Sequence, residues 1–456
     1  MKRPGIILVV VLVVAAMTAM IAVGLMFVAR AEVAASAGDA RGEQAHAAAV
    51  SGIQHAVAVL QYYRQDMQVW YDDPEVFQAQ HVADDGADSW YFSVYAAYVD
   101  QQEETVRYGV IDEGGKLNLN TVSEEALVRL QILTDDLRDC LLDYRDRDDE
   151  VRRGGAEQDY YDNLLYPYLI PNGPFATVEE LFMVKGFNAE VVYGEDANFN
   201  GLLDPNEDDG DESMPPDNRD GRLDPGLRDL LTVYSAVPNV DREGRRRTDI
   251  NAGPPRNLGL SQDTVRFIEI YLSEGNRFTH PSQLLEMQYR VQRANQRYRD
   301  VRPGDTIESG VGPDELPTVV DRLTVGNQRT LRGLVNVNTA RPEVLAALPG
   351  LDINRAQDIV DVRMGLSPET KSTIAWLYTQ NLVDADAFKE VAPLLMADSR
   401  QFLVRCVGFG VPCGRFRVLE AVVDLSGSTP RIAYLRDLTR LGLPFALDPE
   451  SLERTR

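Results

Sequence analysis

One long apolar run at the N-terminus constrains this chain more than any other feature. After Met1-Lys2-Arg3-Pro4-Gly5, residues 6–29 are uncharged and almost wholly apolar. A helix over this run, at about 1.5 Å per residue, spans the ~30 Å hydrocarbon core of a membrane. The run is longer than the roughly 7–15 apolar residues of a secretory signal. Because Lys2 and Arg3 precede it, we expect one membrane crossing with the N-terminus in the cytoplasm.

The same helix is expected to continue beyond the membrane as an amphipathic helix over residues 30–63. Its apolar positions recur at helical intervals: Val33, Ala37, Ala40, Ala47, Val50, Ile53, Val57 and Leu60. Such a stripe must be buried, and a small antiparallel sheet can cover it. β-Branched and aromatic residues predict strands at 90–99 and 106–110, joined by a polar turn at 100–104, and again at 402–407, 415–425 and 431–435.

The position of Gly5, between a short basic leader and the apolar run, resembles the signal of type IV pilins and type II secretion pseudopilins. The resemblance implies that prepilin peptidase cuts after Gly5 and that Ile6 becomes the methylated first residue of the mature chain. Most pilins carry Glu at the fifth mature position, where this chain has Val10. The missing Glu is typical of the K-type minor pseudopilins, which the family places at the filament tip. Taken alone, the segment also fits an uncleaved signal anchor on an unrelated protein.

The composition fits an anchored chain whose remainder is soluble. A length of 456 residues, 44% of them hydrophobic, suggests two to four domains with packed cores. With 46 basic and 71 acidic residues the formal charge is −25, which disfavours binding to nucleic acid or anionic lipid. The four histidines lie far apart, and no P-loop, dinucleotide fingerprint or His-Glu-x-x-His motif occurs. No enzyme is predicted, although the many carboxylates leave a glycosidase pair open.

Three cysteines leave two alternatives open. Cys406 and Cys413 flank residues 407–412, whose Gly and Pro content suits a tight turn between strands. In an oxidising compartment they could form a short disulfide and leave Cys140 alone, and two free cysteines are equally compatible with the sequence.

A phrase in the middle of the chain is repeated. Residues 116–127, which contain Asn118-Leu119-Asn120-Thr121, return at 334–345 as Asn336-Val337-Asn338-Thr339, with a weaker echo at 248–253. Each full copy predicts a short strand followed by a helix, so an internal duplication is the simplest explanation.

The second copy runs on through Gly350 to Arg363 in the pattern of a helix-hairpin-helix. One interpretation is a competence-type, membrane-tethered DNA receptor that uses this unit. The negative charge and the lack of a Lys/Arg cluster around Gly350 favour a helical unit without a ligand. K-type pseudopilins carry SAM-like units with the same Asn-Thr-Ala phrase.

Residues 196–207 match the 12-residue calcium loop. Calcium takes 6–8 oxygen ligands, and alternate residues of a turned loop can supply them. The predicted ligands are Asp196, Asn198, Asn200, the backbone carbonyl of Leu202, Asp204 and Glu207. Gly201 permits the turn.

A second, less complete loop follows. It repeats the Asp-Gly-x-Leu-Asp core but has Pro216 and Leu227 at its first and last positions. Its predicted ligands are Asp208, Asp217, Asp220 and Asp224. Because this acidic stretch would repel itself without cations, we expect one or two structural calcium ions and no catalytic role for them.

Together these features predict an α+β chain: a pilin-like long N-terminal helix on a small antiparallel sheet, with a large inserted helical domain. The predicted parts are a leader (1–5), the membrane helix (6–29), its outer part (30–70), pilin-like strands (71–116), a first SAM-like unit with calcium loops at 195–227 (117–330), a second SAM-like or helix-hairpin-helix-like unit (331–400) and closing strands (401–456). Residues 256–315 look like an additional segment whose role stays open.

The resemblance also implies the role of the chain. A minor pseudopilin K of a type II secretion system lies in the inner membrane with its bulk in the periplasm. It joins the I- and J-type minor pseudopilins at the pseudopilus tip, starts filament assembly and assists export of folded proteins across the outer membrane. Prepilin peptidase is the implied processing partner, and the secretin or an exoprotein is a further contact; no nucleic-acid partner is expected. Which exoproteins are exported stays open.

Overall fold

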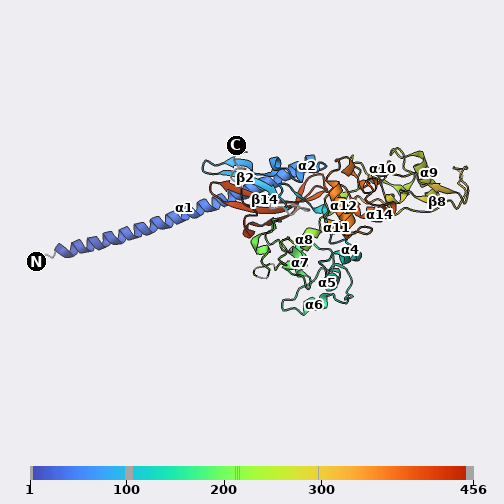
Figure 1. The fold of residues 1–456 in the computed structure, drawn as a ribbon. Coiled ribbons are helices and arrows are strands. Elements are labelled where there is room, and N and C mark those ends of the chain that lie inside the picture. The colour runs from blue at the N-terminus through green and yellow to red at the C-terminus, as the bar shows by residue number, and fades with distance from the viewer. Residues whose placement is uncertain are drawn as a thin grey trace.

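The computed structural model describes residues 4–97, 106–210, 212, 214, 216–295 and 297–447, with side chains from Ile7 onward. Its first element is α1 (Pro4–Tyr63), a continuous helix of 60 residues. The first half of α1 projects away from the rest of the molecule (Figure 1). Within the described residues, α1 is the one helix long and apolar enough to cross a membrane.

The second half of α1 packs on the sheet. Its buried residues are Ala45, Ala48, Ala49, Gly52, Ile53, Ala56, Val57, Val59 and Leu60. The predicted continuation of the helix is confirmed, but its buried stripe begins at Ala45, because Val33 is 70% exposed and Ala47 lies on the solvent side. Two glycines allow the close contact: an added Cβ would lie 2.3 Å from Ala45 O at Gly408 and 2.4 Å from Cys406 Sγ at Gly52.

The sheet is antiparallel and joins strands from both ends of the sequence. Its order is β1 (Gln80–Asp84), β2 (Ser89–Tyr95), β14 (Gln401–Val411), β15 (Phe416–Asp424) and β16 (Arg431–Asp437), and β3 (Ile111–Asp112) also pairs with β14. Since β2 precedes the helical region and β14 follows it, the region between them is an insertion into the sheet. The predicted α+β fold is confirmed.

Some strand predictions are wrong in detail. The hairpin partner of β2 is β1, a polar and mostly exposed edge strand that hydrophobic alternation did not reveal. Residues 106–110 form no strand; Ala96 and Arg107 make an isolated bridge, and the predicted turn 100–104 lies outside the described residues. Residues 407–411 continue β14 rather than forming a loop, so the turn to β15 lies at 412–415.

The insertion contains three copies of one unit, each closed by a short parallel strand pair. The pairs are β4 (Leu117–Asn118) with β5 (Leu231–Thr232), β7 (Thr248–Asp249) with β10 (Leu323–Thr324), and β12 (Val335–Asn336) with β13 (Leu395–Met396). The weak echo at 248–253 is therefore a true middle copy, and it contains the additional segment 256–315. The domain boundaries expected from the sequence stay predictions.

Short helices and hairpins fill the three copies. The first contains α4 (Glu124–Arg129), α5 (Asp135–Arg145), α6 (Gln158–Asp162), α7 (Ala189–Tyr193) and α8 (Leu227–Leu230). The middle copy contains α9 (Gln262–Ser273), α10 (Leu316–Arg322) and the hairpin of β8 (Gln288–Arg290) with β9 (Thr306–Glu308). The third contains α11 (Pro342–Ala346), α12 (Ile353–Arg363), α13 (Trp376–Thr379) and α14 (Ala385–Val391). Outside them, α2 (Met67–Trp70) and α3 (Pro74–Phe77) follow α1, and β6 (Ala236–Pro238) pairs with β11 (Thr330–Arg332).

The hydrophobic core is divided in the same way. One apolar cluster lies between α1 and the sheet and includes Ile53, Val94 and Val404. A larger cluster runs through all three copies of the insertion, from Leu127 through Phe267 to Trp376. In Figure 1 the insertion occupies the end of the molecule away from the projecting half of α1, with the first copy at one side.

Candidate functional site

The predicted calcium loop, residues 196–207, lies between α7 and α8 in the first copy. Gly201 has a φ of +73°, in the left-handed region that glycine adopts without strain, so the turn forms where the sequence predicts it. The loop ends in a short 3₁₀ turn, Pro205–Glu207, for which Asp204 is the N-terminal cap. Its backbone path therefore agrees with a tightly turned ligand loop.

The predicted ligand side chains turn toward the interior of this loop. The two carboxylate oxygens of Asp196 accept hydrogen bonds from the amides of Asn200 (3.1 Å) and Gly201 (3.0 Å). Those of Glu207 accept from the amides of Ala197 (2.8 Å) and Asp204 (3.0 Å). Three further bonds complete the loop: Asn198 Nδ2 to Asp204 Oδ2 (2.7 Å), Asn200 Nδ2 to the same oxygen (3.0 Å) and Leu202 N to Asn200 Oδ1 (2.7 Å).

Burial makes the charges of this loop costly. Asp196 is 7% exposed and Glu207 is 1% exposed. Burial raises the pKa of Asp196 to about 6 and that of Glu207 to about 7. The described structure gives neither carboxylate an ion pair with Lys, Arg or His within 4.0 Å. The charge of Arg405 acts on Asp196 from beyond ion-pair distance and offsets only part of the effect of burial on its pKa. Buried oxygen donors with no cationic side chain in contact fit a hard divalent cation such as Ca²⁺.

The residues of the second predicted loop are less well gathered. Asp217 Oδ2 accepts from the amides of Asp209 (2.9 Å) and Gly210 (2.6 Å), whereas Asp208, Asp220 and Asp224 are exposed. The sequence missed Glu195, which is 6% exposed and accepts from the amides of Asn218 (3.3 Å) and Asp224 (2.8 Å). The signal for it was its position directly before Asp196 at the start of the acidic stretch. The second ligand set stays a prediction.

The predicted calcium loop also takes part in the contact between the insertion and the sheet. Phe199, whose φ is +62°, lies under the guanidinium groups of Arg228 (4.0 Å), Arg436 (5.6 Å) and Arg405 (5.7 Å from the ring centroid). Asn200 Nδ2 donates to Pro444 O at 2.8 Å. The conformation of the loop is therefore coupled to how the first copy contacts the sheet.

The repeated Asn-Thr phrase is explained by structural hydrogen bonds. Asn120 exchanges two bonds with the backbone of Phe175 (2.9 and 2.7 Å), and Asn251 does the same with Phe278 (2.8 and 2.9 Å). Asn338 Nδ2, in the third copy, donates to the carbonyl oxygens of Lys371 (2.9 Å) and Ala397 (3.0 Å). In each copy the side-chain amide of this asparagine therefore holds a later segment of the same copy in place.

In the first and third copies, an arginine at the end of the second helix, α5 or α12, donates hydrogen bonds to two backbone carbonyls of the repeated motif. Arg145 Nη1 donates to Leu119 O (2.6 Å) and Val122 O (3.1 Å). Arg363 Nη1 donates to the matching carbonyls, Val337 O (3.4 Å) and Ala340 O (2.6 Å). Arg363 is 3% exposed, so it is not available to a phosphate.

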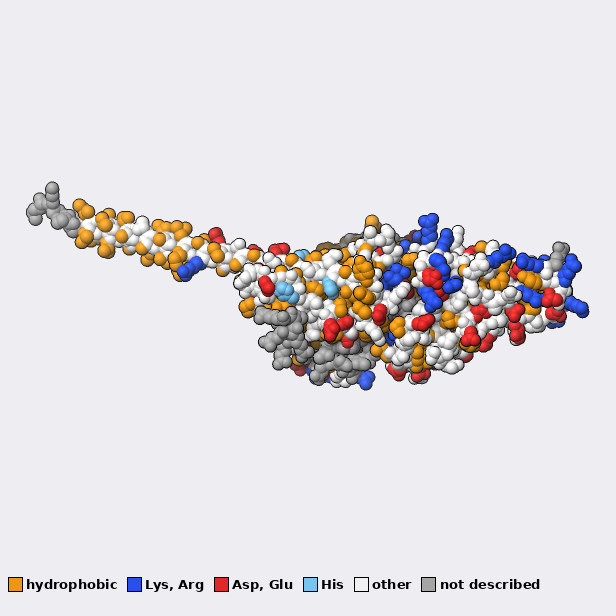
Figure 2. All heavy atoms as spheres, turned by 90° about the horizontal axis from the view of Figure 1, so that it is seen from above, with side chains coloured by type: hydrophobic (Ala, Val, Ile, Leu, Met, Phe, Trp, Pro, Cys, Tyr) orange, Lys and Arg blue, Asp and Glu red, His pale blue; other side chains and the backbone are white. Residues whose placement is uncertain are grey.

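The surroundings of the hairpin between α11 and α12 are unfavourable for a nucleic acid. An added Cβ at Gly350, whose φ is +73°, would lie 3.3 Å from the carboxylate of Glu390. Exposed arginines instead gather at the far end of the middle copy, where Figure 2 shows a basic surface. They are Arg290, Arg293, Arg297, Arg299 and Arg302. The helix-hairpin-helix unit lacks the cationic setting that phosphate binding requires.

The cysteines are free in the structure: Cys140 and Cys406 are buried and Cys413 is partly exposed. The disulfide considered between Cys406 and Cys413 is not formed, because residues 407–411 are a strand and not a turn. β14 continues from Cys406 to Val411, so Cys406 lies five strand residues, or about 16 Å along the strand, before the turn that carries Cys413. A disulfide needs Cα atoms about 4.4–6.8 Å apart.

A hollow of about 1070 Å³ lies where the end of α1 meets the middle and third copies. His280 lines it, and its Nδ1 lies 2.8 Å from Ser282 Oγ. This contact is explained by helix capping, since His280 Nδ1 also accepts from the amide of Ser282 (3.2 Å) at the start of a 3₁₀ turn, Pro281–Leu284. The pair therefore gives no reason to assign a catalytic role to the hollow.

Comparisons with known proteins agree with the repeated units. Two family models, both described as Type II secretion system (T2SS), protein K, match residues 115–193 and 335–395, which lie in the first and third copies. The chain is also similar to a chain in a solved structure, the GspK–GspI–GspJ complex from the enterotoxigenic Escherichia coli type 2 secretion system. The two chains share 11% identity with a TM-score of 0.39, and the match covers 88% of this chain and 98% of the other. A search of curated proteins gave no significant match. On the two family models, the chain belongs to the protein K family of the type II secretion system, whose members are minor pseudopilins.

Proposed function

We propose that this minor pseudopilin stands at the tip of the pseudopilus, where it joins the I- and J-type minor pseudopilins, starts filament assembly and assists export of folded proteins across the outer membrane. The position of the insertion carries this proposal. The middle and third copies lie beyond the end of the sheet away from the projecting half of α1, and the first copy lies at one side (Figure 1). A subunit with this bulk above its sheet leaves little room for another subunit stacked on top.

The exposed half of α1 supports the same place in the filament. Apart from Thr18, its side chains from Ile7 to Val28 are apolar and exposed, so they need a membrane or neighbouring helices to cover them. Val10, 55% exposed, stands where most pilins have a Glu that is thought to pair with the amine of a neighbouring subunit. A subunit with nothing ahead of it has no use for such a carboxylate, which would be costly to bury alone.

The proposal includes the processing and the topology of the chain. Prepilin peptidase cuts after Gly5 and methylates Ile6, α1 crosses the inner membrane, and the rest of the chain lies in the periplasm. The experiment is intact-mass measurement of the chain from cells with and without the peptidase. A chain that starts at methylated Ile6 only in the presence of the peptidase supports the proposal, and an uncut Met1 or a cut beyond Ala29 overturns it.

The assembly role needs a separate experiment. The full-length chain is purified in detergent from cells that also make the I- and J-type subunits. Recovery of one complex with a single copy of this chain is expected. Recovery of the chain alone, or as the main subunit of long filaments, contradicts a place at the tip.

The calcium loop is proposed as a structural clip. Asp196, Asn198, Asn200, Asp204 and Glu207, with the carbonyl of Leu202, would hold one Ca²⁺ and fix the contact with the sheet. A DNA receptor remains the alternative that a titration can exclude: duplex binding that strengthens at low salt would support it.

A further inference from the structure

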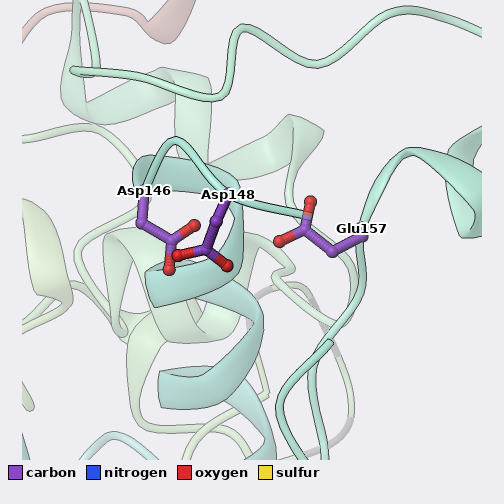
Figure 3. Close-up of side chains that lie close together, drawn as sticks. All are labelled: Asp146, Asp148 and Glu157. Atoms are coloured by element: carbon purple, nitrogen blue, oxygen red, sulfur yellow. The ribbon is translucent and has the colours of Figure 1, made fainter. Parts of the chain in front are cut away.

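A second group of carboxylates in the first copy lies outside both predicted calcium loops. Asp146, Asp148 and Glu157 each offer a carboxylate oxygen, and these oxygens all lie within 4.8 Å of one another. Among the described residues, no other group of three or more acidic, His or Cys side chains is gathered this closely. Figure 3 shows the three carboxylates turned toward one another from the two ends of one loop.

Glu157 is the decisive member of this group. It is 3% exposed, and neither of its carboxylate oxygens has a hydrogen-bond partner. Its neighbours increase the cost, because burial together with the charges of Asp143, Asp146 and other acidic residues raises the pKa of Glu157 to about 7. A buried carboxyl group aimed at two other carboxylates, with no donor to either oxygen, requires a positive ligand when it is ionised.

Arg152 does not fill this role. Its guanidinium lies beside Asp143 (Nε to Oδ1, 3.3 Å), Glu124 (3.3 Å) and, at 3.9 Å, Asp146. It makes no ion pair with Glu157 within 4.0 Å, and the main causes of the raised pKa of Glu157 are burial and acidic neighbours. Arg152 therefore offsets the negative charges of Asp143, Glu124 and Asp146, and it leaves Glu157 without a cationic partner.

The loop that carries the three carboxylates has the spacing of a cation loop. It starts at the end of α5 and finishes at the start of α6, and Asp146, Asp148 and Glu157 are its first, third and twelfth residues. The first, third and twelfth residues of the predicted calcium loop, Asp196 to Glu207, are oxygen donors in the same way. The sequence pattern did not reveal this similarity, because the sixth residue is Val151 here and Gly201 in the predicted calcium loop.

We propose that Asp146, Asp148 and Glu157 bind one divalent cation, for which Ca²⁺ is the best match to an all-oxygen ligand set. The ion would link the end of α5 to the start of α6 within the first copy. Asp148 Oδ1 already accepts from the amide of Glu150 (3.0 Å), which holds the side chain in a turn and leaves its other oxygen free for the ion. The inference does not depend on the proposed function, because it concerns only the internal structure of the first copy.

The test is a count of bound Ca²⁺ on the full-length chain in detergent, by equilibrium dialysis with radioactive Ca²⁺ after treatment with chelator. Glu157→Gln keeps the volume and removes the charge, and it should bind one Ca²⁺ fewer per chain than the wild type. Asp148→Asn, at an exposed position, should lose the same ion without disturbing the core. Asp159→Asn is the matched control, since it removes one negative charge from an exposed position of α6 and should leave the count unchanged.

Comparison with the other loop makes the result specific. Glu207→Gln should lower the count independently, and the double variant with Glu157→Gln should show the sum of both losses. Circular dichroism in chelator checks that every variant is folded. The proposal is overturned if Glu157→Gln and Asp148→Asn both bind as many Ca²⁺ ions as the wild type.

Discussion

Glu420, on β15 next to the central strand β14, forms a buried ion pair with Arg228 on α8 of the insertion. A second arginine, Arg405 on β14, donates to the other carboxylate oxygen of Glu420 at 3.0 Å. Burial alone would raise the pKa of Glu420, but the two guanidinium groups outweigh it and lower the pKa to about 2. One carboxylate therefore joins the pilin-like sheet to the inserted domain.

Removing this charge should destabilise the chain strongly. Glu420→Gln leaves Arg405 without its ion pair and Arg228 with only the partly exposed Glu179, and loss of one partner of a buried pair costs about 3–5 kcal/mol of unfolding free energy. Urea denaturation followed by circular dichroism measures it. Glu179→Gln is the control, because this partly exposed partner of Arg228 (3.3 Å) should cost no more than about 1 kcal/mol. Equal losses in the two variants would contradict the assigned role of Glu420.

The same pair predicts how stability depends on acid. Because the pKa of Glu420 is lower in the folded chain than in the unfolded chain, its contribution is complete above about pH 4.5 and is lost as the pH falls toward about 2. We expect the unfolding free energy of the wild type to decrease more over this interval than that of Glu420→Gln. Parallel pH profiles for the two chains would show that Glu420 is not held ionised.

Calcium should stabilise the chain through the 196–207 loop. An ion that binds only the folded state at a concentration about 100-fold above its dissociation constant adds about 2.7 kcal/mol. Thermal unfolding of the full-length chain in detergent should therefore shift to lower temperature with excess chelator, and Glu207→Gln should reduce this shift. Glu190→Gln, an exposed glutamate on α7, should behave as the wild type. A melting curve that chelator leaves unchanged would count against a structural calcium site.

The two matching arginines of the repeats should act alike. Arg363→Met and Arg145→Met each leave two backbone carbonyls without their donor, which costs about 1–3 kcal/mol for buried acceptors. Arg332→Met, at an exposed position, should change stability by less than about 0.5 kcal/mol. Equilibrium unfolding compares the three. A loss at Arg363 without one at Arg145 would show that the two copies are not equivalent.

The contact between α1 and β14 depends on glycine. In Gly408→Ala the new methyl group would lie 2.3 Å from Ala45 O and Ala49 N, so the helix must move away from the sheet. Overpacking of this kind costs about 1–3 kcal/mol or more. Gly427→Ala, whose nearest neighbour is Thr429 O at 3.5 Å, is the control and should be nearly neutral. Unfolding curves that coincide for both variants would mean that the helix is less closely packed than the structure indicates.

Local patterns in the sequence determined several features directly. The apolar run and its amphipathic continuation predicted α1, because helical periodicity depends only on neighbouring residues. The spacing of ligand residues predicted the loop around Gly201, and the repeated phrase predicted two of the three inserted units. Each of these features is set by residues within a short stretch of chain.

Only the tertiary structure decided how distant segments meet. Three contacts join residues that no local pattern relates. They are the pairing of β2 with β14, the bonds of Asn251 with Phe278 in the middle copy, and the ion pair of Glu420 with Arg228. The same holds for Cys406, whose place inside a strand keeps it from Cys413, and for the unpartnered Glu157. Burial and long-range charge pairing depend on the packed arrangement, so they cannot be read from spacing along the chain.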